Sequence, residues 1–240
     1  MLIAAQVFTN EDAAMTDQDT PTDDFKELCR LCNQGRLYEV EVWCKAGRPV
    51  DFTHWNPRLT PIGIAIDRRF HSLVELLLRN GASPSGGALR LAVRQANLGI
   101  VELLFRFGAD WQSVAFKEVI RCAHPGIVKM FIERGADIFA DYPIAEGLKL
   151  ATKAFLGVYK DYIDRFPQLR VQAAIALRHF CAKGSMRGVC LLLWAGADPH
   201  LPVPRKFGEP ADLWESACEE AKWKHNADIL RKLEMASRAA

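Results

Sequence analysis

Two cysteines, Cys29 and Cys32, have the spacing of a redox pair or of half a metal site. A structural zinc site needs four ligands, and no second CxxC or HxxxH segment lies at a matching distance in the sequence. Both cysteines fall instead on the apolar side of a predicted helix, together with Phe25 and Leu28. We therefore expect core thiols, because free cysteine behaves as a small buried hydrophobe, and we expect no metal and no cofactor.

The histidines offer no better case for catalysis. None of the six pairs with a serine or cysteine in a recognisable nucleophile setting, and the sequence lacks GxSxG, HExxH, Walker and GxGxxG motifs. We predict that the protein is not an enzyme. A cleft that held His179, Cys181 and an acid in contact would revive the alternative.

The composition is that of an ordinary globular chain, with 240 residues of which 50% are hydrophobic and 25% are charged. No apolar run is long enough for a membrane span, so we expect no membrane partner. The cysteines number seven, an odd count that fits reduced thiols better than a disulfide framework. These features predict a cytoplasmic protein.

Charge is distributed unevenly along the sequence. Residues 1–24 contain six acidic residues and no Lys or Arg, which leaves residues 25–240 with 31 basic against 23 acidic side chains, a net charge of +8. The stretch from Thr9 to Asp24 has few groups that could pack against a core. We predict a disordered acidic tail over residues 1–22 and one folded domain over residues 23–240.

One helix ending recurs along the chain. Its copies are LVELLLRNGAS (73–83), IVELLFRFGAD (100–110), IVKMFIERGAD (127–137), VCLLLWAGAD (189–198) and the weaker EVEVWCKAGRPVD (39–51). Each copy has apolar residues at helical spacing and stops at a glycine, which can adopt the positive φ of a helix cap without a Cβ penalty. The predicted caps are Gly47, Gly81, Gly108, Gly135 and Gly196. A second short apolar helix precedes each ending, so the predicted unit is helix, tight turn, helix.

The second unit contains the string Thr60-Pro61-Ile62-Gly63-Ile64-Ala65 and resembles the ankyrin repeat. Pro61 suits the first turn of a helix, where its missing N–H would have no partner, and Thr60 can cap the same end. The family's usual histidine is replaced by Gly63. We expect this repeat to be loosened as a result.

The resemblance covers residues 24–236 and implies an all-α solenoid of six or seven helix-turn-helix units. The glycine caps are 34, 27, 27 and 61 residues apart, whereas an ankyrin unit has about 33. The third and fourth units should therefore have shortened fingers. The longest interval should hold two units, of which the fifth, Ile144–Phe166, ends in Phe166-Pro167 instead of glycine. A seventh unit with a charged, capping surface is expected from Glu209 onward.

Aligning units two to four on their outer helices reveals a basic series. One column contains Asp67, Arg94 and Arg121, and the next contains Arg68, Gln95 and Cys122, with Lys153 and Lys183 from units five and six. In an ankyrin stack this end of the inner helix lines the concave surface. The resemblance thus implies a positive stripe across the groove. The open alternative is a set of solvated charges on an exposed helix face.

Aromatic residues form a second candidate contact set in the connections between units, where ankyrin fingers project: Phe52, Trp55, Trp111, Phe139, Tyr142 and Phe207. Trp, Tyr and Arg are the residues most often found as interface anchors. We select Trp55 and Trp111 as partner contacts. Packing of these rings over the edge of the stack remains an equal alternative.

The function implied by this fold is non-catalytic binding of a partner protein in the concave groove, with an acidic partner surface and an unbound monomer. One alternative is a dedicated inhibitor or immunity-type protein that blocks a specific enzyme or toxin. Another is a nucleic-acid binder, which is less favoured because phosphate binding requires a stronger basic excess. Acids such as Asp67, Glu118 and Glu146 also lie near the basic series.

Overall fold

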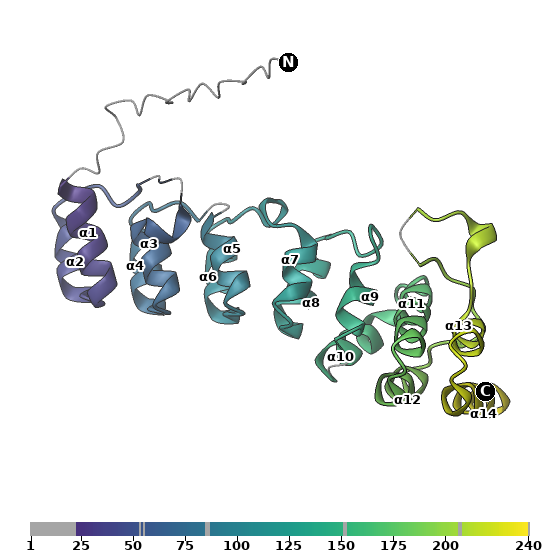
Figure 1. Ribbon diagram of the computed structural model, residues 1–240. Helices are drawn as coiled ribbons and strands as arrows, with labels where there is room; N and C mark the ends of the chain where they lie inside the picture. The colour runs from purple at the N-terminus through teal and green to yellow at the C-terminus, as the bar shows by residue number, and fades with distance from the viewer. Residues whose placement is uncertain are drawn as a thin grey trace, which may run out of the picture.

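The computed structural model describes residues 23–52, 54, 56–84, 87–150, 153–205 and 208–239. Within these ranges the chain forms seven pairs of antiparallel α-helices (Figure 1). The pairs are α1 (Asp23–Gln34) and α2 (Leu37–Lys45), α3 (Pro61–Asp67) and α4 (His71–Arg79), α5 (Gly87–Arg94) and α6 (Leu98–Arg106), α7 (Phe116–Arg121) and α8 (Pro125–Glu133), α9 (Pro143–Leu148) and α10 (Lys153–Ile163), α11 (Leu169–Ala182) and α12 (Met186–Trp194), and α13 (Ala217–Trp223) and α14 (Ala227–Ala239). The predicted acidic tail, residues 1–22, lies outside the described residues.

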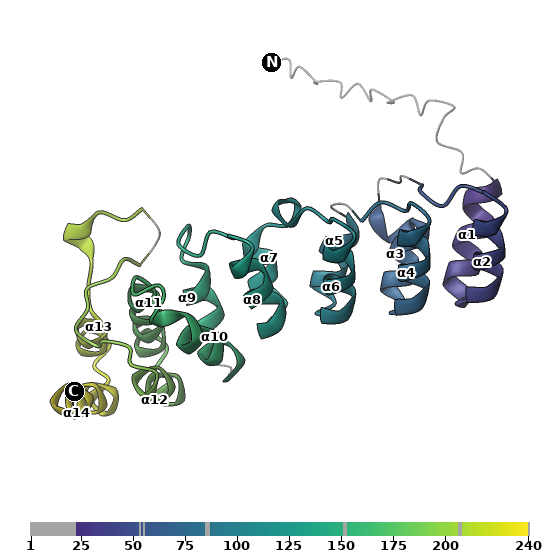
Figure 2. The same cartoon turned by 180° about the vertical axis from the view of Figure 1, so that it is seen from behind.

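The helix pairs stack in sequence order. The first helices of the pairs, here called the inner row, pack successively from α1 on α3 to α11 on α13. The second helices, the outer row, pack successively from α2 to α10, and α12 packs on α14. Figures 1 and 2 show α1–α8 from the side but α11–α14 nearly end-on, so the stack turns beyond α9. This arrangement confirms the predicted solenoid of helix-turn-helix units.

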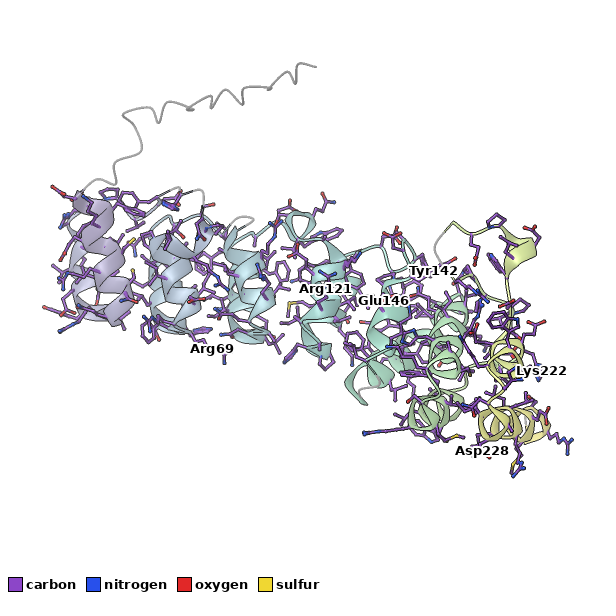
Figure 3. The ribbon with its side chains drawn as sticks, viewed as in Figure 1. Arg69, Arg121, Tyr142, Glu146, Lys222 and Asp228 are labelled. Atoms are coloured by element: carbon purple, nitrogen blue, oxygen red, sulfur yellow. The ribbon has the colours of Figure 1, made fainter. Side chains whose placement is uncertain are left out.

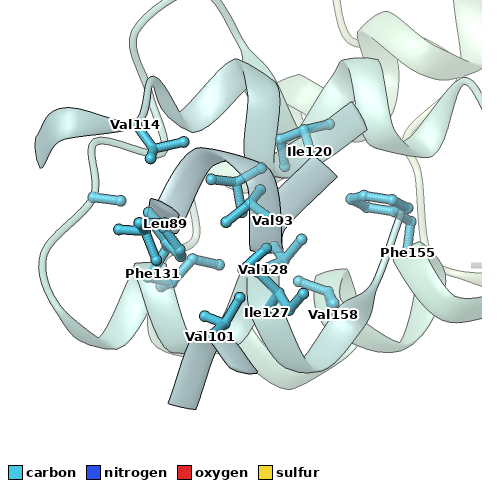
Figure 4. Close-up of a cluster of buried hydrophobic side chains, with 14 of the residues drawn as sticks. Leu89, Val93, Val101, Val114, Ile120, Ile127, Val128, Phe131, Phe155 and Val158 are labelled. Atoms are coloured by element: carbon cyan, nitrogen blue, oxygen red, sulfur yellow. The ribbon is translucent and has the colours of Figure 1, made fainter. Parts of the chain in front are cut away.

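One apolar cluster extends through the stack, from Leu28 in α1 to Leu233 in α14. Figure 4 shows its central part, where side chains of successive repeats lie together: Leu89, Val93, Val101, Ile127, Val128, Phe131 and Phe155. Each two-helix unit is too small to bury its own apolar face, so its stability depends on its neighbours. No helix in the described ranges is both long and apolar enough to cross a membrane.

The predicted glycine caps are confirmed. All five have positive φ, between 70° and 95°: Gly47, Gly81, Gly108, Gly135 and Gly196. The alanine that follows three of these glycines is buried, as at Ala82, Ala136 and Ala197. A side chain larger than a methyl group would have to displace neighbouring residues there.

Most of the tight turns inside the repeats also need a left-handed residue. The turn residues have φ between 52° and 68°, and only two of them are glycine: Gly35, Arg69, Ala96, Ala123, Gly184 and His225. A non-glycine residue is strained in this region because its Cβ approaches the backbone. The alanines at two of these turns therefore reduce the stability of their repeats.

Replacing Ala96 or Ala123 with glycine is expected to raise the free energy of unfolding by about 0.5–1 kcal/mol each, because glycine relieves the left-handed strain. Gly184→Ala should lower it by a similar amount. Urea unfolding would measure these changes. Ala88→Gly, inside α5, is the matched control and should destabilise; stability losses of equal size for Ala96→Gly and Ala88→Gly would contradict the prediction.

The connections between repeats vary in length as predicted. The third and fourth repeats are entered through seven residues (80–86) and nine residues (107–115), whereas fifteen residues (46–60) lead into the second. The longer connection contains a 3-10 turn, η1 (Pro57–Leu59), and a second turn, η2 (Trp111–Ser113), precedes α7. The fingers of repeats three and four are therefore shortened.

The second repeat compensates for its missing histidine. Thr60 Oγ1 accepts a hydrogen bond from the Gly63 N–H at 3.0 Å, so Thr60 caps α3 as predicted. Gly63 is buried, and a Cβ at this position would overlap the carbonyl oxygen of Pro57 in η1. The η1 turn thus occupies the space that a side chain would need. The absent side chain therefore leaves no gap, and the expected loosening of this repeat stays a prediction.

The fifth repeat closes without a glycine cap. Phe166 packs against the rings of Phe139 and Tyr162, with centroid distances of 6.0 and 6.4 Å. The buried Gln172 of α11 joins this repeat to the next, since its side chain donates to Ile138 O at 2.5 Å and accepts from the Ala145 N–H at 3.0 Å. Aromatic and amide contacts thus replace the usual helix ending.

The longest connection, residues 195–216, leads into the seventh repeat and contains the turn η3 (Ala211–Leu213). A single β-bridge pairs Val203 with Glu215 within it. The Arg178 side chain of α11 holds the two ends of this connection together. Its guanidinium group lies 2.6 Å from the Glu215 carboxylate and 3.0 Å from the Glu220 carboxylate, and it donates a hydrogen bond to Val203 O at 3.0 Å. Arg178 and Glu220 are both buried.

Candidate functional site

The basic series lies at the ends of the inner helices, as the repeat alignment predicts for four of its five members. Arg94 and Arg121 are the last residues of α5 and α7, and Arg68 and Lys183 are the residues that follow α3 and α11. All four side chains belong to exposed residues. In four of the seven repeats, the C-terminal end of the inner helix therefore carries an exposed cationic side chain.

The placement of Lys153 is the exception. The alignment puts it at the end of the fifth inner helix, but it is the first residue of the outer helix α10. The fifth inner helix ends at Leu148, and Lys149 follows it in the position that Arg68 and Lys183 occupy. The error arises because this repeat lacks the glycine that sets the register elsewhere. We define the cationic row as Arg68, Arg94, Arg121, Lys149 and Lys183.

The members of the cationic row differ in their partners. Asn33 Oδ1 accepts hydrogen bonds from Arg68 Nε at 3.0 Å and Nη2 at 2.7 Å, and Lys149 Nζ lies 2.6 Å from Glu146. The side chains of Arg94 and Arg121 form no ion pair or hydrogen bond with any residue that the structure describes. Figure 3 shows Arg121 near the middle of the stack. These two guanidinium groups are available to an external carboxylate.

A nearby acid is already engaged. Asp67, which shares the column of Arg94, accepts a hydrogen bond from Gln95 Nε2 at 2.9 Å. The Arg90 side chain likewise lies 3.5 Å from Glu118 in the next repeat. These contacts link neighbouring repeats. Arg94 and Arg121 are left without a carboxylate partner among the described residues.

The cationic row continues into α9 and α11 around His179. Burial lowers the pKa of His179, and the positive charges of Lys149 and Lys183 lower it further, while Glu146 opposes the change. Burial is the main cause of this shift, and the two lysines add a smaller contribution of the same sign. Figure 3 shows Glu146 on α9.

The predicted aromatic contacts have mixed positions. Trp55 and Phe207 lie outside the described residues, and Trp111 is half-buried against the core. Phe52 is also half-buried and meets Phe25 edge to face, with a centroid distance of 5.4 Å. Two tryptophans outside the predicted contact set are far more accessible: Trp194 is 68% exposed and Trp223 is 69% exposed.

Comparisons with known proteins identify the architecture. No protein-family model and no curated protein matches the sequence. Among solved structures, the ankyrin repeat domain of human ASB11 is 17% identical, with a TM-score of 0.60, and the alignment covers 87% of this chain and 96% of that domain. The ankyrin repeat domain of Bcl-3, a member of the IkappaB family, is 22% identical, with a TM-score of 0.58, and the alignment covers 90% and 99%.

The chain has the ankyrin-repeat fold. Its seven helix pairs correspond to ankyrin repeats, and its cationic row lies where the inner helices of such a stack end.

Three of the seven thiols of this ankyrin-repeat stack are buried: Cys32, Cys181 and Cys218. Burial raises the pKa of Cys29 to about 11, and it raises the pKa of Cys32 and of Cys181 to about 12. The prediction of a core thiol is confirmed for Cys32, which is buried in the apolar cluster, but not for Cys29, which is half-buried outside that cluster and donates to Leu59 O at 3.4 Å. A thiol that stays protonated is a poor nucleophile and a poor metal ligand. Among the described residues, no group of three His, Cys, Asp or Glu side chains could hold a metal ion.

The buried thiols predict a loss of stability in alkali. Unfolded cysteines ionise near pH 9, whereas Cys32 and Cys181 stay protonated in the folded state up to about pH 12. The stabilisation is complete below pH 9 and declines as the pH rises, by about 1 kcal/mol per pH unit for each thiol. Urea unfolding at pH 8 and pH 10.5 would measure it. The Cys32→Ala, Cys181→Ala double variant should show a smaller decline, and an equal decline would contradict this account.

Proposed function

We propose that the protein is a non-catalytic protein-interaction module that binds the acidic surface of a partner protein on the concave face of its inner row. The supporting observation is the pair Arg94 and Arg121, which lie at equivalent positions of adjacent repeats, are exposed, and have no carboxylate partner among the described residues. An acidic partner would supply the missing charges, and such complementarity favours association rate and specificity.

The proposal extends along the stack. Lys149 and Lys183 add positive charge two and three repeats beyond Arg94, and Arg68 adds it one repeat before. A solenoid suits such a task because neighbouring repeats share one core while the ends of the inner helices are free to vary. The proposal keeps Trp55, Trp111 and Lys153 as candidate partner contacts.

The proposal includes a cytoplasmic site of action and an unbound monomer. All seven cysteines are free thiols, which fits a reducing compartment.

The test is affinity capture of partner proteins from a nuclease-treated native lysate with three forms of the chain. The Arg94→Glu, Arg121→Glu variant should lose the specific partners. The control is Arg106→Glu, Arg187→Glu, which makes the same charge change on the outer helices α6 and α12, where both arginines are exposed. Circular dichroism would verify that both variants fold. Undiminished capture by the inner-row variant, or equal loss from both variants, would overturn the proposal.

A further inference from the structure

We infer that a hollow beside Trp223 is an anchor subsite for an aromatic or large aliphatic side chain of the partner, in a segment where carboxylates flank that side chain. The inference rests on the proposed function and names the chemistry at one end of the same surface.

Trp223 belongs to the same column as the central arginines. It is the last residue of α13, as Arg94 is of α5 and Arg121 is of α7. Lys224 follows α13 as Lys183 follows α11. The seventh repeat therefore continues the cationic row but replaces an arginine of the row with an indole ring.

The indole borders a shallow hollow with a volume of about 710 Å³, lined by Glu219, Lys222, Trp223 and His225. Trp223 is 69% exposed, so most of its ring remains for a partner to cover. In the described part of the chain, no helix packs on the side of α13 opposite α11. Figure 3 shows Lys222 at this end of the stack.

The charges around the hollow favour an acidic segment. Lys222 lies in the lining, and Lys224 Nζ lies 5.6 Å from the Trp223 ring centroid. The one acid in the lining, Glu219, is used by its own helix: its carboxylate accepts a hydrogen bond from the Ser216 N–H at 2.6 Å, which lowers the pKa of Glu219. Two lysines thus oppose one ionised carboxylate, and the excess positive charge favours an incoming carboxylate.

Large aromatic side chains surrounded by polar groups are typical of the few residues that dominate binding energy. An apolar side chain placed against the indole would remove apolar area of both partners from water. The flanking lysines would then select a segment with neighbouring carboxylates. This combination distinguishes the subsite from the central arginines, which recognise charge alone.

The experiment uses two fluorescent synthetic peptides of Asp, Glu and Ser that differ only in one central residue, Phe or Ala. Binding to the full chain is measured by fluorescence anisotropy. The Phe peptide should bind the unmodified protein about tenfold more tightly than the Ala peptide. Trp223→Ala should abolish this difference. Trp194→Ala is the matched control, because Trp194 is equally exposed but ends an outer helix, and it should preserve the difference.

The outcomes separate the inference from the proposed function. If both peptides bind equally and Arg94→Glu, Arg121→Glu weakens both, the subsite is overturned while the proposed acidic recognition stands. If neither peptide binds, both are contradicted. A second copy of the chain is the other possible occupant of the hollow, and light scattering tests it. Self-association that Trp223→Ala abolishes would assign the hollow to that second copy and overturn the inference.

Discussion

Replacing Arg178 with methionine is expected to lower the free energy of unfolding of the last two repeats by about 3–5 kcal/mol. Glu220 is only 6% exposed and its carboxylate lies 3.0 Å from the guanidinium. Without Arg178 that carboxylate keeps, among the described residues, only Arg205 as a cationic partner, at 3.8 Å, and Val203 O is left with one donor, the Glu215 N–H at 3.3 Å. Urea unfolding would measure the loss, and hydrogen exchange would locate it in α11–α14.

A second substitution distinguishes an unpaired charge from lost packing. Removing Glu220 together with Arg178, as Arg178→Met, Glu220→Leu, should recover most of the lost stability, because no buried charge is then left without its partner. The surface pair Arg79 and Glu75 provides the control, and Arg79→Met should change stability by less than about 1 kcal/mol. If the double variant is as unstable as Arg178→Met, packing and not charge explains the effect.

The second large effect is expected at Gly63. Gly63→Ala should destabilise the second repeat by about 1–3 kcal/mol, and Gly63→His by more, because the added Cβ overlaps the Pro57 carbonyl oxygen and the η1 turn must move. Restoring the residue usual in ankyrin repeats therefore harms this protein. Urea unfolding of the two variants would measure the losses.

Gly157 is the matched control for this prediction. It lies within α10, is exposed, and has no atom within 4 Å of a Cβ built on its backbone. Gly157→Ala should raise stability by about 0.5–1 kcal/mol, since alanine loses less conformational freedom on folding. A stable Gly63→Ala variant would contradict the close approach of η1 to α3.

The repeat architecture could be predicted from the sequence because its signals are local. A glycine cap, the apolar spacing before it and the Thr60-Pro61 helix start each depend on a few neighbouring residues. The fifth repeat has no such glycine, and there the alignment shifted: Lys153 was assigned the position that Lys149 holds. Without a local marker, the sequence does not reveal which lysine ends the inner helix.

Other features depend on contacts between distant segments. Arg178 and Glu220 are 42 residues apart, and nothing in either local sequence indicates that they meet in the core. Trp223 was also missed, although extending the alignment column of Arg94 and Arg121 into the seventh repeat would have found it. The compensation at Gly63 required the course of the η1 turn, which periodicity does not specify.

Zero-length carbodiimide cross-linking of a captured complex, followed by mass spectrometry, tests acidic recognition by the inner row most directly. The reagent joins a lysine amine to a carboxylate in contact with it, so each cross-link reports both the location and the charge of the partner's contact. We predict links from partner Asp or Glu residues to the inner-row lysines Lys149, Lys183, Lys222 and Lys224. Links confined to the outer-helix lysines Lys45, Lys129 and Lys232 would contradict the account.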